Sequence, residues 1–309
     1  MVAVEEFQVE SNGLRMHVAA AGPEDAPVLL CLHGFPEGWM SWRPVMERLG
    51  HRYRIYAPDL RGYGQTEKPQ HGYDVLTLTD DIRGLVDALN LNEPILVGHD
   101  WGGGLSWLYG HRYGRTLRHL VVVNCTHPKT LFRGILERRA GQHFKSWYMG
   151  AFQIPWLPEH LATAAGGAVL KRAMLSMEGR PGAMNTALLD EVLGRFKTAD
   201  DLRGPIAYYR EIARMQVSPE GRQALAAIYA QPITCPTTVI WGDQDHALSM
   251  EVAQLSHKDA GREVEWVTLQ GIGHFVSMED PQSLSDELLA VADRAFASHW
   301  EAQPAPAGE

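Results

Sequence analysis

An aspartate stands at the centre of a glycine-rich segment, Gly98-His99-Asp100-Trp101-Gly102-Gly103. The pattern is typical of a nucleophile elbow, a strand-to-helix turn so tight that small residues must flank the central one. Ser usually occupies that position, which suits acyl transfer. A Ser that attacked a saturated carbon would form an ether, which water does not readily cleave, whereas Asp forms an ester that can be hydrolysed. Asp100 therefore indicates displacement at an sp3 carbon through an alkyl-enzyme ester.

The residues around Asp100 supply the elements that an elbow requires. Pro94-Ile95-Leu96-Val97 has the pattern of a buried strand between a Pro and a Gly. Leu105-Ser106-Trp107-Leu108-Tyr109 begins a helical pattern that ends near Gly114. The alternative is an ordinary Gly-rich turn with an Asp that caps a helix. The order strand, sharp turn and helix favours the elbow.

A nucleophile of this kind needs a base, and the base needs an acid that orients it. The predicted strand 237–241 leads into a loop with Asp243 and Asp245, and the predicted strand 264–269 leads into a loop with His274. Loops at the carboxyl ends of parallel strands share the sheet edge where ligand sites form. The chain order nucleophile, acid, histidine is that of α/β hydrolases. His274 is the predicted base, and both aspartates remain candidates for the acid, because Asp often only bonds a turn.

Strand and helix patterns alternate through the first half of the chain. Residues 77–89 show a helical pattern, because apolar side chains recur at Leu78, Ile82 and Leu85 on one helix face. The other predicted elements are strands at 14–20, 28–32, 53–57 and 117–123 and a helix at 41–49. Such alternation predicts an α/β fold, with a mostly parallel sheet covered by helices on both faces.

The pattern changes in residues 128–217, which show helical spacing without clear strands. This segment is rich in aromatic residues: Phe144, Trp147, Tyr148, Phe152, Trp156, Phe196, Tyr208 and Tyr209. Strand patterns then return, and a last helix is expected at 283–298. We therefore predict a core of residues 1–127 and 218–309, into which a helical cap of residues 128–217 is inserted. Residues 303–308 are expected to form a frayed tail.

The composition of the 309-residue chain narrows its possible partners. A net charge of −9 without a basic stripe argues against nucleic acid or an anionic membrane. Residues 1–10 lack a signal-peptide pattern and no apolar run is long enough to span a bilayer, so a soluble, cytoplasmic protein is expected. Cys31, Cys125 and Cys235 are isolated, which favours buried thiols over disulfides or zinc. The 14 His show no metal-binding spacing, and we expect neither a metal nor a cofactor.

Together these motifs resemble those of the epoxide hydrolases of the α/β-hydrolase fold, of the soluble, bacterial type. The resemblance runs from about residue 28 to residue 281 and includes the cap. Its motifs are His33-Gly34-Phe35-Pro36, Asp59-Leu60-Arg61-Gly62-Tyr63-Gly64-Gln65-Thr66, the elbow, Trp241-Gly242-Asp243-Gln244-Asp245 and Gly273-His274-Phe275. In this family the acid lies two to three residues before an apolar pair, which matches Asp245 better than Asp243.

The resemblance also implies an oxyanion hole. In the family one backbone N–H comes from the His-Gly-x-Pro turn, here Phe35, and the other from the residue after the nucleophile, here Trp101. The bond before Pro36 is usually cis in the family, which would turn the Phe35 amide into the site. The two amides would stabilise the oxyanion that forms when water attacks the Asp100 ester. His274 would take the proton from that water, and Asp245 would hold the imidazole.

Opening of an epoxide also requires an acid, because the alkoxide leaving group is strongly basic. Members of the family use two cap tyrosines. One lies in a segment that ends Phe-Gln-x-Pro, which matches Tyr148, and the other precedes an Arg, which matches Tyr209. Helical neighbours point about 100° apart, so only one of Tyr208 and Tyr209 can face the nucleophile. We expect a small apolar epoxide and water as reactants, a monomer or a homodimer, and substrate contacts from aromatic residues: Phe35, Trp101, Trp147, Phe152 and Phe275.

Two other functions use parts of the same pattern. Dehalogenases have the same Asp nucleophile, but a halide leaves without an acid. Haloalkane dehalogenases typically carry Asn where this chain has Phe35, and fluoroacetate dehalogenases carry Arg where it has Trp101, although Trp147 or Trp156 could donate to a halide. A non-catalytic receptor on the same fold is the second alternative. A receptor has no need of a nucleophile, an acid and a base together. Ester hydrolysis as the main activity is disfavoured, because a carboxylate is a poor acyl acceptor.

Overall fold

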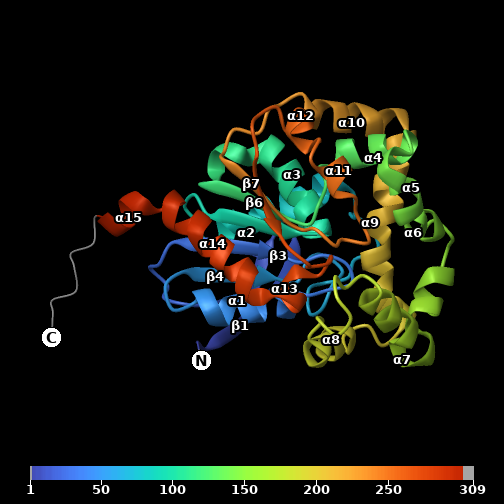
Figure 1. Ribbon diagram of the computed structural model, residues 1–309, viewed down its shortest axis with the longest axis horizontal. Helices are drawn as coiled ribbons and strands as arrows, with labels where there is room; N and C mark the ends of the chain where they lie inside the picture. The colour runs from blue at the N-terminus through green and yellow to red at the C-terminus, as the bar shows by residue number, and fades with distance from the viewer. Residues whose placement is uncertain (1, 302–309) are drawn as a thin grey trace.

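Eight strands form a single sheet in the order β1-β2-β4-β3-β5-β6-β7-β8 (Figure 1). The computed structural model describes residues 2–301, so the predicted tail at 303–308 lies outside the described residues. β1 and β4 pair with β2 in antiparallel orientation, and the remaining neighbours are parallel. The strands are β1 (Val4–Ser11), β2 (Leu14–Ala21), β3 (Val28–Leu32), β4 (Arg54–Pro58), β5 (Ile95–His99), β6 (His119–Val123), β7 (Thr237–Gly242) and β8 (Glu265–Leu269).

Helices cover both faces of this sheet (Figure 1). They are η1 (Trp39–Trp42), α1 (Arg43–Leu49), α2 (Val75–Ala88), α3 (Trp101–Tyr113), η2 (Gly114–Thr116), α10 (Pro219–Tyr229), α11 (Met250–Ala253), α12 (Ser256–Ala260), α13 (Val276–Glu279), α14 (Pro281–Ala295) and α15 (Ala297–Glu301). Successive strand residues belong to two different apolar clusters, as Leu29 and Leu30 do, because side chains alternate between the faces of a strand. One cluster packs on α1 and α14 and the other on α2 and α3. The predicted α/β architecture is confirmed.

The parallel strands end level at one edge of the sheet. Leu32 at the end of β3 pairs with Gly98 of β5, and His99 pairs with Val123 at the end of β6. Gly242 at the end of β7 pairs with Leu269 at the end of β8. The loops that follow these strands therefore emerge side by side, as the sequence predicted for the segments with Asp100, Asp245 and His274.

Between β6 and β7 the chain is helical. Residues 128–217, all of them described, contain no strand. Their helices are α4 (Pro128–Leu136), η3 (Arg139–Gly141), α5 (Gln142–Lys145), α6 (Trp147–Ala151), α7 (Leu157–Leu175), α8 (Thr186–Leu193) and α9 (Ala199–Val217). In Figure 1, α9 runs along one side of the core, and α5 and α6 lie on its outer side. Within residues 2–301, no helix of the protein is both long and apolar enough to cross a membrane.

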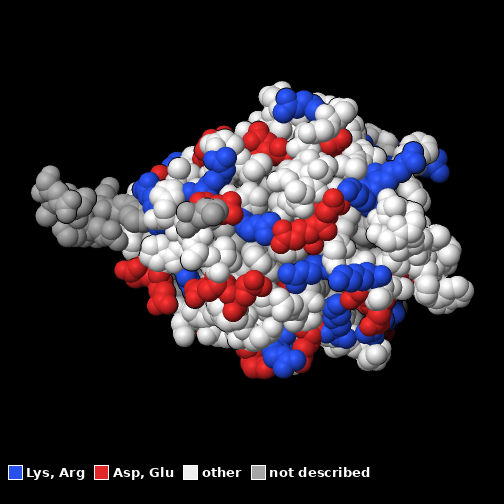
Figure 2. Space-filling view, turned by 90° about the horizontal axis from the view of Figure 1, so that it is seen from below, with Lys and Arg blue, Asp and Glu red and all other residues white. Residues whose placement is uncertain are grey.

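Several polar contacts fasten this helical segment to the core. Gln142 of α5 bonds the backbone at Ala247 and Ser249, and Arg43 of α1 forms an ion pair with Glu191 of α8. On the face shown in Figure 2, basic and acidic side chains are interspersed, which permits pairs of this kind. Exposed ion pairs contribute little stability, about 0–1 kcal/mol each. The buried contacts of Gln142 therefore do more to fix the segment over the sheet edge.

Candidate active site

The turn at Asp100 has the geometry of an elbow. β5 ends at His99 and α3 begins at Trp101, which confirms the predicted order of strand, turn and helix. Asp100 has φ 47° and ψ −117°, a conformation that L residues rarely adopt. A Cβ at Gly98 would lie 2.3 Å from the carbonyl oxygen of Gly102, and a Cβ at Gly102 would lie 2.2 Å from that of Leu32. The two glycines are therefore required by the close approach of backbone, as the motif predicted.

The carboxylate of Asp100 is held by a backbone amide on one side and a histidine on the other. The Phe35 N–H donates to Oδ1 at 2.7 Å, and the bond between Phe35 and Pro36 is cis, as expected. Nε2 of His274 lies 3.5 Å from Oδ2. Burial alone would raise the pKa of Asp100, but His274, His99 and the Phe35 amide outweigh it and lower the pKa. Asp100 is thus ionised at neutral pH.

Asp245 binds the other ring nitrogen of His274, with Nδ1 and Oδ2 2.8 Å apart. Its Oδ1 accepts from the N–H groups of Ala247 and Leu248 at 2.7 and 2.8 Å, and Asn124 donates to Oδ2 at 2.7 Å. These donors and His274 lower the pKa of Asp245 although burial opposes them. Burial would likewise lower the pKa of His274, but Asp245 and Asp100 raise it well above its ordinary value. The structure brings Asp100, His274 and Asp245 together.

Asp243 has a different partner. Its Oδ1 accepts from the N–H of Gly271 at 2.7 Å and so joins the loops after β7 and β8.

We expect Asp243→Asn to keep this bond, because the Asn oxygen accepts equally well, and to leave turnover within a few-fold of the parent. Asp245→Asn cannot accept from all four donors around the carboxylate, and we expect turnover to fall by about two to four orders of magnitude. Steady-state rates of both variants check this, and equal losses would contradict the assignment of the acid.

A buried ion pair behind the site was not predicted from the sequence. Nδ1 of His99 lies 2.9 Å from Oε2 of Glu37, and Nε2 lies 2.8 Å from the carbonyl oxygen of His274. Two acceptors require both ring nitrogens to donate, so His99 is an imidazolium, and Glu37 raises its pKa although burial opposes this. The same Glu37 oxygen accepts from the Gly34 amide at 2.7 Å. The pair therefore ties the turn before Phe35, the elbow and the His274 loop to one another.

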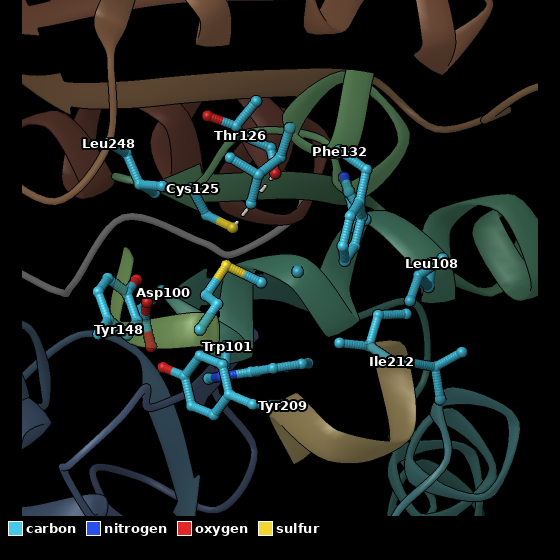
Figure 3. A pocket seen from close by; sticks show the side chains of 15 residues that line it. Asp100, Trp101, Leu108, Cys125, Thr126, Phe132, Tyr148, Tyr209, Ile212 and Leu248 are labelled. Carbon is cyan, nitrogen blue, oxygen red and sulfur yellow. Dashed lines mark hydrogen bonds between the residues drawn. The ribbon is translucent and has the colours of Figure 1, made fainter. Parts of the chain in front are cut away.

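A pocket opens onto Asp100 between the core and the helical segment. Figure 3 shows Asp100, Tyr148 and Tyr209 at one end of it and Leu108, Phe132 and Ile212 at the other. Tyr148 comes from α6 and Tyr209 from α9, and the hydroxyls of both point toward the Asp100 carboxylate (Figure 3). Burial and the charge of Asp100 raise the pKa of both tyrosines. Each hydroxyl thus stays protonated at neutral pH.

Tyr208 does not share this orientation. Its hydroxyl donates to the backbone carbonyl of Arg61 at 2.9 Å, inside the core. The contact fixes α9 at a point where Gly204 and Gly62 touch, because a Cβ at Gly204 would lie 2.8 Å from the Cα of Gly62. Of the two adjacent tyrosines, Tyr209 therefore lines the pocket and Tyr208 anchors the helix.

Among the aromatic residues expected to contact substrate, only Trp101 lines the pocket within the described part of the chain. Phe35 and Phe152 pack edge to face on Tyr209, with ring centroids 5.4 and 5.0 Å away. Phe275 is buried against His99 and His274. Trp147 is 70% exposed, because it precedes Tyr148 on α6 and neighbouring side chains point about 100° apart. This corrects the expectation for Trp147, which lies on the outer surface.

A mostly parallel sheet with a carboxylate elbow, an acid and a histidine at its carboxyl edge defines an α/β hydrolase. A family model of the alpha/beta hydrolase fold matches residues 27–281. Epoxide hydrolase 4 of Homo sapiens is 34% identical over 280 residues, which span 89% of this chain and 74% of the human protein.

Solved structures show the same likeness. The crystal structure of an epoxide hydrolase from Vigna radiata matches with a TM-score of 0.79 and 28% identity, over 94% of this chain and 98% of that one. Cfl2 from Burkholderia cenocepacia matches with a TM-score of 0.81 and 26% identity, over 93% and 95% of the two chains. The chain belongs to the epoxide hydrolase family of the α/β-hydrolase fold. The family that the sequence motifs predicted is thereby confirmed.

Proposed function

We propose that this protein hydrolyses an apolar epoxide to a vicinal diol through an ester formed on Asp100. The observation that carries the proposal is the presence of an elbow carboxylate and two protonated tyrosine hydroxyls in one largely apolar pocket. A carboxylate can open an epoxide ring only when the alkoxide receives a proton or strong hydrogen bonds as it forms. Tyr148 and Tyr209 are the groups placed to provide them. The relatives in Homo sapiens and Vigna radiata are named for this activity, which supports the proposal.

In the first step Oδ2 of Asp100 attacks a ring carbon, and the bond from that carbon to the epoxide oxygen breaks. Oδ2 is the oxygen placed for this attack, because Oδ1 accepts the Phe35 amide at 2.7 Å, whereas the contact of Oδ2 with Nε2 of His274 is longer, at 3.5 Å. The proton of one tyrosine passes to the alkoxide, and the second hydroxyl donates to the same oxygen. The lowered pKa of Asp100 and the raised pKa values of the tyrosines keep all three groups in the required protonation state.

In the second step His274 takes a proton from water, and the resulting hydroxide attacks Cγ of the Asp100 ester. Asp100 is one of the charges that raise the pKa of His274, and esterification removes it. The pKa therefore falls, and His274 gives up its proton, which restores the tyrosine that was deprotonated in the first step. Only then is the neutral imidazole available as a base. The amides of Phe35 and Trp101 stabilise the oxyanion on Oδ1, and Trp101 has the first N–H of α3, which has no partner within the helix. The ester bond then breaks, and Oδ2 leaves with the diol and takes up the proton of the hydroxyl that was added at Cγ, so that Asp100 is again a carboxylate.

We expect His274→Gln to be alkylated at Asp100 and to release no diol, because only the second step needs a base. Intact-protein mass spectrometry after addition of styrene oxide should show the mass of the enzyme plus one substrate. Digestion should place that mass on the peptide with Asp100. An unmodified variant that has lost all activity would show that His274 acts in the first step, and a variant that still turns over would show that it is not the base.

Dehalogenation is the nearest alternative, and the position of two tryptophans counts against it. A halide leaves without an acid and needs N–H donors instead. Trp147 and Trp156, the candidates for a second halide donor, are 70% and 71% exposed and lie on the outer surface. Among the described residues, Trp101 is the one tryptophan that lines the pocket, and the hydroxyls of Tyr148 and Tyr209 beside it are the donors that an alkoxide requires.

We propose that the helical segment 128–217 acts as the cap of this site. It contributes Tyr148 and Tyr209 and most of the apolar wall opposite α3. Lys145 of α5 donates to the carbonyl oxygen of Asp245 at 2.6 Å, and this bond supports the acid loop from the cap side. The cap thus has two tasks, to supply the ring-opening acids and to exclude water from the developing alkoxide.

A further inference from the structure

The pocket extends from Asp100 in one direction along α3. Gly104 and Leu108 lie four residues apart, so they share one face of α3, and Asp100 directly precedes the helix; all three line the pocket. At a rise of 1.5 Å per residue, this floor is about 12 Å long. Phe132 of α4 and Ile212 of α9 close the far end (Figure 3). The space is long enough for one aryl or alkyl substituent, and its end has no charged side chain among the described residues.

Behind the two tyrosines the molecule is filled. Phe35 and Phe152 pack edge to face with ring centroids 5.4 Å apart, and both contact Tyr209. Phe152 also packs on Tyr148 at 5.7 Å. Neither phenylalanine lines the pocket, so within residues 2–301 the pocket does not continue past the tyrosines. An epoxide whose oxygen meets the tyrosine hydroxyls has room for a substituent on the α3 side only.

Gly104 differs from the glycines that precede it. A Cβ at Gly102 would lie 2.2 Å from the Leu32 carbonyl oxygen, and a Cβ at Gly103 would lie 2.5 Å from Cβ of Cys125, so packing requires both glycines. A Cβ at Gly104 would meet, among the described atoms, only Sγ of Cys125 at an ordinary 3.9 Å. Gly in a helix interior is less favourable than Ala by about 1 kcal/mol. Neither packing nor helix formation accounts for Gly104, whereas the open space above it belongs to the pocket.

We propose that the substrates are epoxides with a single apolar substituent, and that Gly104 limits the size of the substituent that fits along α3. The inference rests on the proposed function and adds the substrate class to it. A methyl group at position 104 would occupy the floor midway between Asp100 and Leu108. It would therefore obstruct the apolar substituent of the substrate, whereas the epoxide ring and the hydroxyls of Tyr148 and Tyr209 would not be affected.

The test compares kcat/KM of the full chain for propylene oxide, styrene oxide and trans-stilbene oxide, which carry a methyl group, one phenyl group and two phenyl groups on opposite carbons. We expect styrene oxide to exceed trans-stilbene oxide by at least about 100-fold, because the second phenyl group has no space. Gly104→Ala should lower kcat/KM for styrene oxide by at least about tenfold and change that for propylene oxide by less than about twofold. Gly104→Leu should lower the styrene oxide value further.

Gly104→Ala should also raise Tm by about 2 °C, since Ala is the better helix former, and this separates a filled pocket from a damaged fold. Gly150→Ala on α6 is the matched control, because a Cβ there would meet no described atom within 4 Å, and it should leave the substrate ratio unchanged. Equal losses for propylene oxide and styrene oxide in Gly104→Ala, or wild-type turnover of trans-stilbene oxide as fast as styrene oxide, would overturn the inference alone. A parent protein that opens none of the three epoxides would overturn the proposed function as well.

Discussion

The Asp100→Ala variant is expected to fold and to form no diol. The methyl side chain cannot attack a ring carbon, and a direct attack by water would have to proceed without the ester. We expect turnover to fall by at least about 10⁴-fold, the loss typical of a removed nucleophile. The Tm should change little, because the elbow depends on the glycines at 98 and 102, whose missing side chains allow the backbone contacts. Diol formation from styrene oxide and a thermal melt check the two parts of this prediction.

The source of the oxygen atoms in the diol shows whether ring opening proceeds through a covalent ester on Asp100. In a single turnover of the parent protein in heavy-oxygen water, one diol oxygen comes from the epoxide and the other from Oδ2 of Asp100. The first diol should therefore be unlabelled, and the label should appear in the peptide with Asp100. Diol that carries one heavy oxygen from the first turnover would show direct attack by water and would contradict the ester mechanism.

The elements that position Asp100 could be predicted because they follow local rules. The buried strand before it is a continuous apolar run, and the glycines on either side mark the turn. β1 (Val4–Ser11) was missed, because it is an edge strand whose residues are mostly polar and partly exposed. Asp74 accepts from the N–H groups of Leu76 and Thr77, so α2 begins at Val75, two residues before its predicted start. Capping side chains thus decide boundaries that apolar periodicity leaves open.

The acid and the supporting pair depend on contacts between distant parts of the chain. Asp243 and Asp245 are two residues apart, and the local sequence does not show which of them is the acid. In the fold Asp243 binds the Gly271 amide, whereas Asp245 binds His274. His99 and Glu37 are separated by 62 positions, and nothing local relates them. His99 lies within the elbow motif, and Glu37 directly follows the motif that ends at Pro36. The resemblance of these motifs to the family was therefore the only sequence signal for the pair. For Trp147 the sequence was misleading. The many aromatic residues of its segment predicted a contact with the substrate, but its side chain points to the outer surface.

Loss of both ring-opening hydroxyls is expected to nearly eliminate alkylation of Asp100. Each of Tyr148→Phe and Tyr209→Phe removes one donor to a developing alkoxide, at a cost of about 2–4 kcal/mol, or about 30- to 1000-fold in rate. The double variant loses the only two hydroxyls that Figure 3 shows directed at Asp100 among the labelled residues. Single-turnover formation of the alkyl-enzyme from styrene oxide measures the first step alone. Hydrolysis of ester already formed should change little, because His274 and its partner Asp245 remain in place.

Tyr208→Phe is the matched control for this experiment. It removes a buried hydroxyl from the same helix, next to Tyr209, and the lost bond to the Arg61 carbonyl costs about 1 kcal/mol of stability. The alkylation rate of Tyr208→Phe should stay near that of the parent. A lower rate in the Tyr148→Phe and Tyr209→Phe variants would then result from the loss of a hydroxyl directed at Asp100, and not from the loss of any buried tyrosine hydroxyl. A double Tyr148→Phe, Tyr209→Phe variant that opens epoxides at a normal rate would remove the reason to prefer an alkoxide over a halide as leaving group. Parallel turnover of a haloalkane by that variant would then identify the chemistry as dehalogenation.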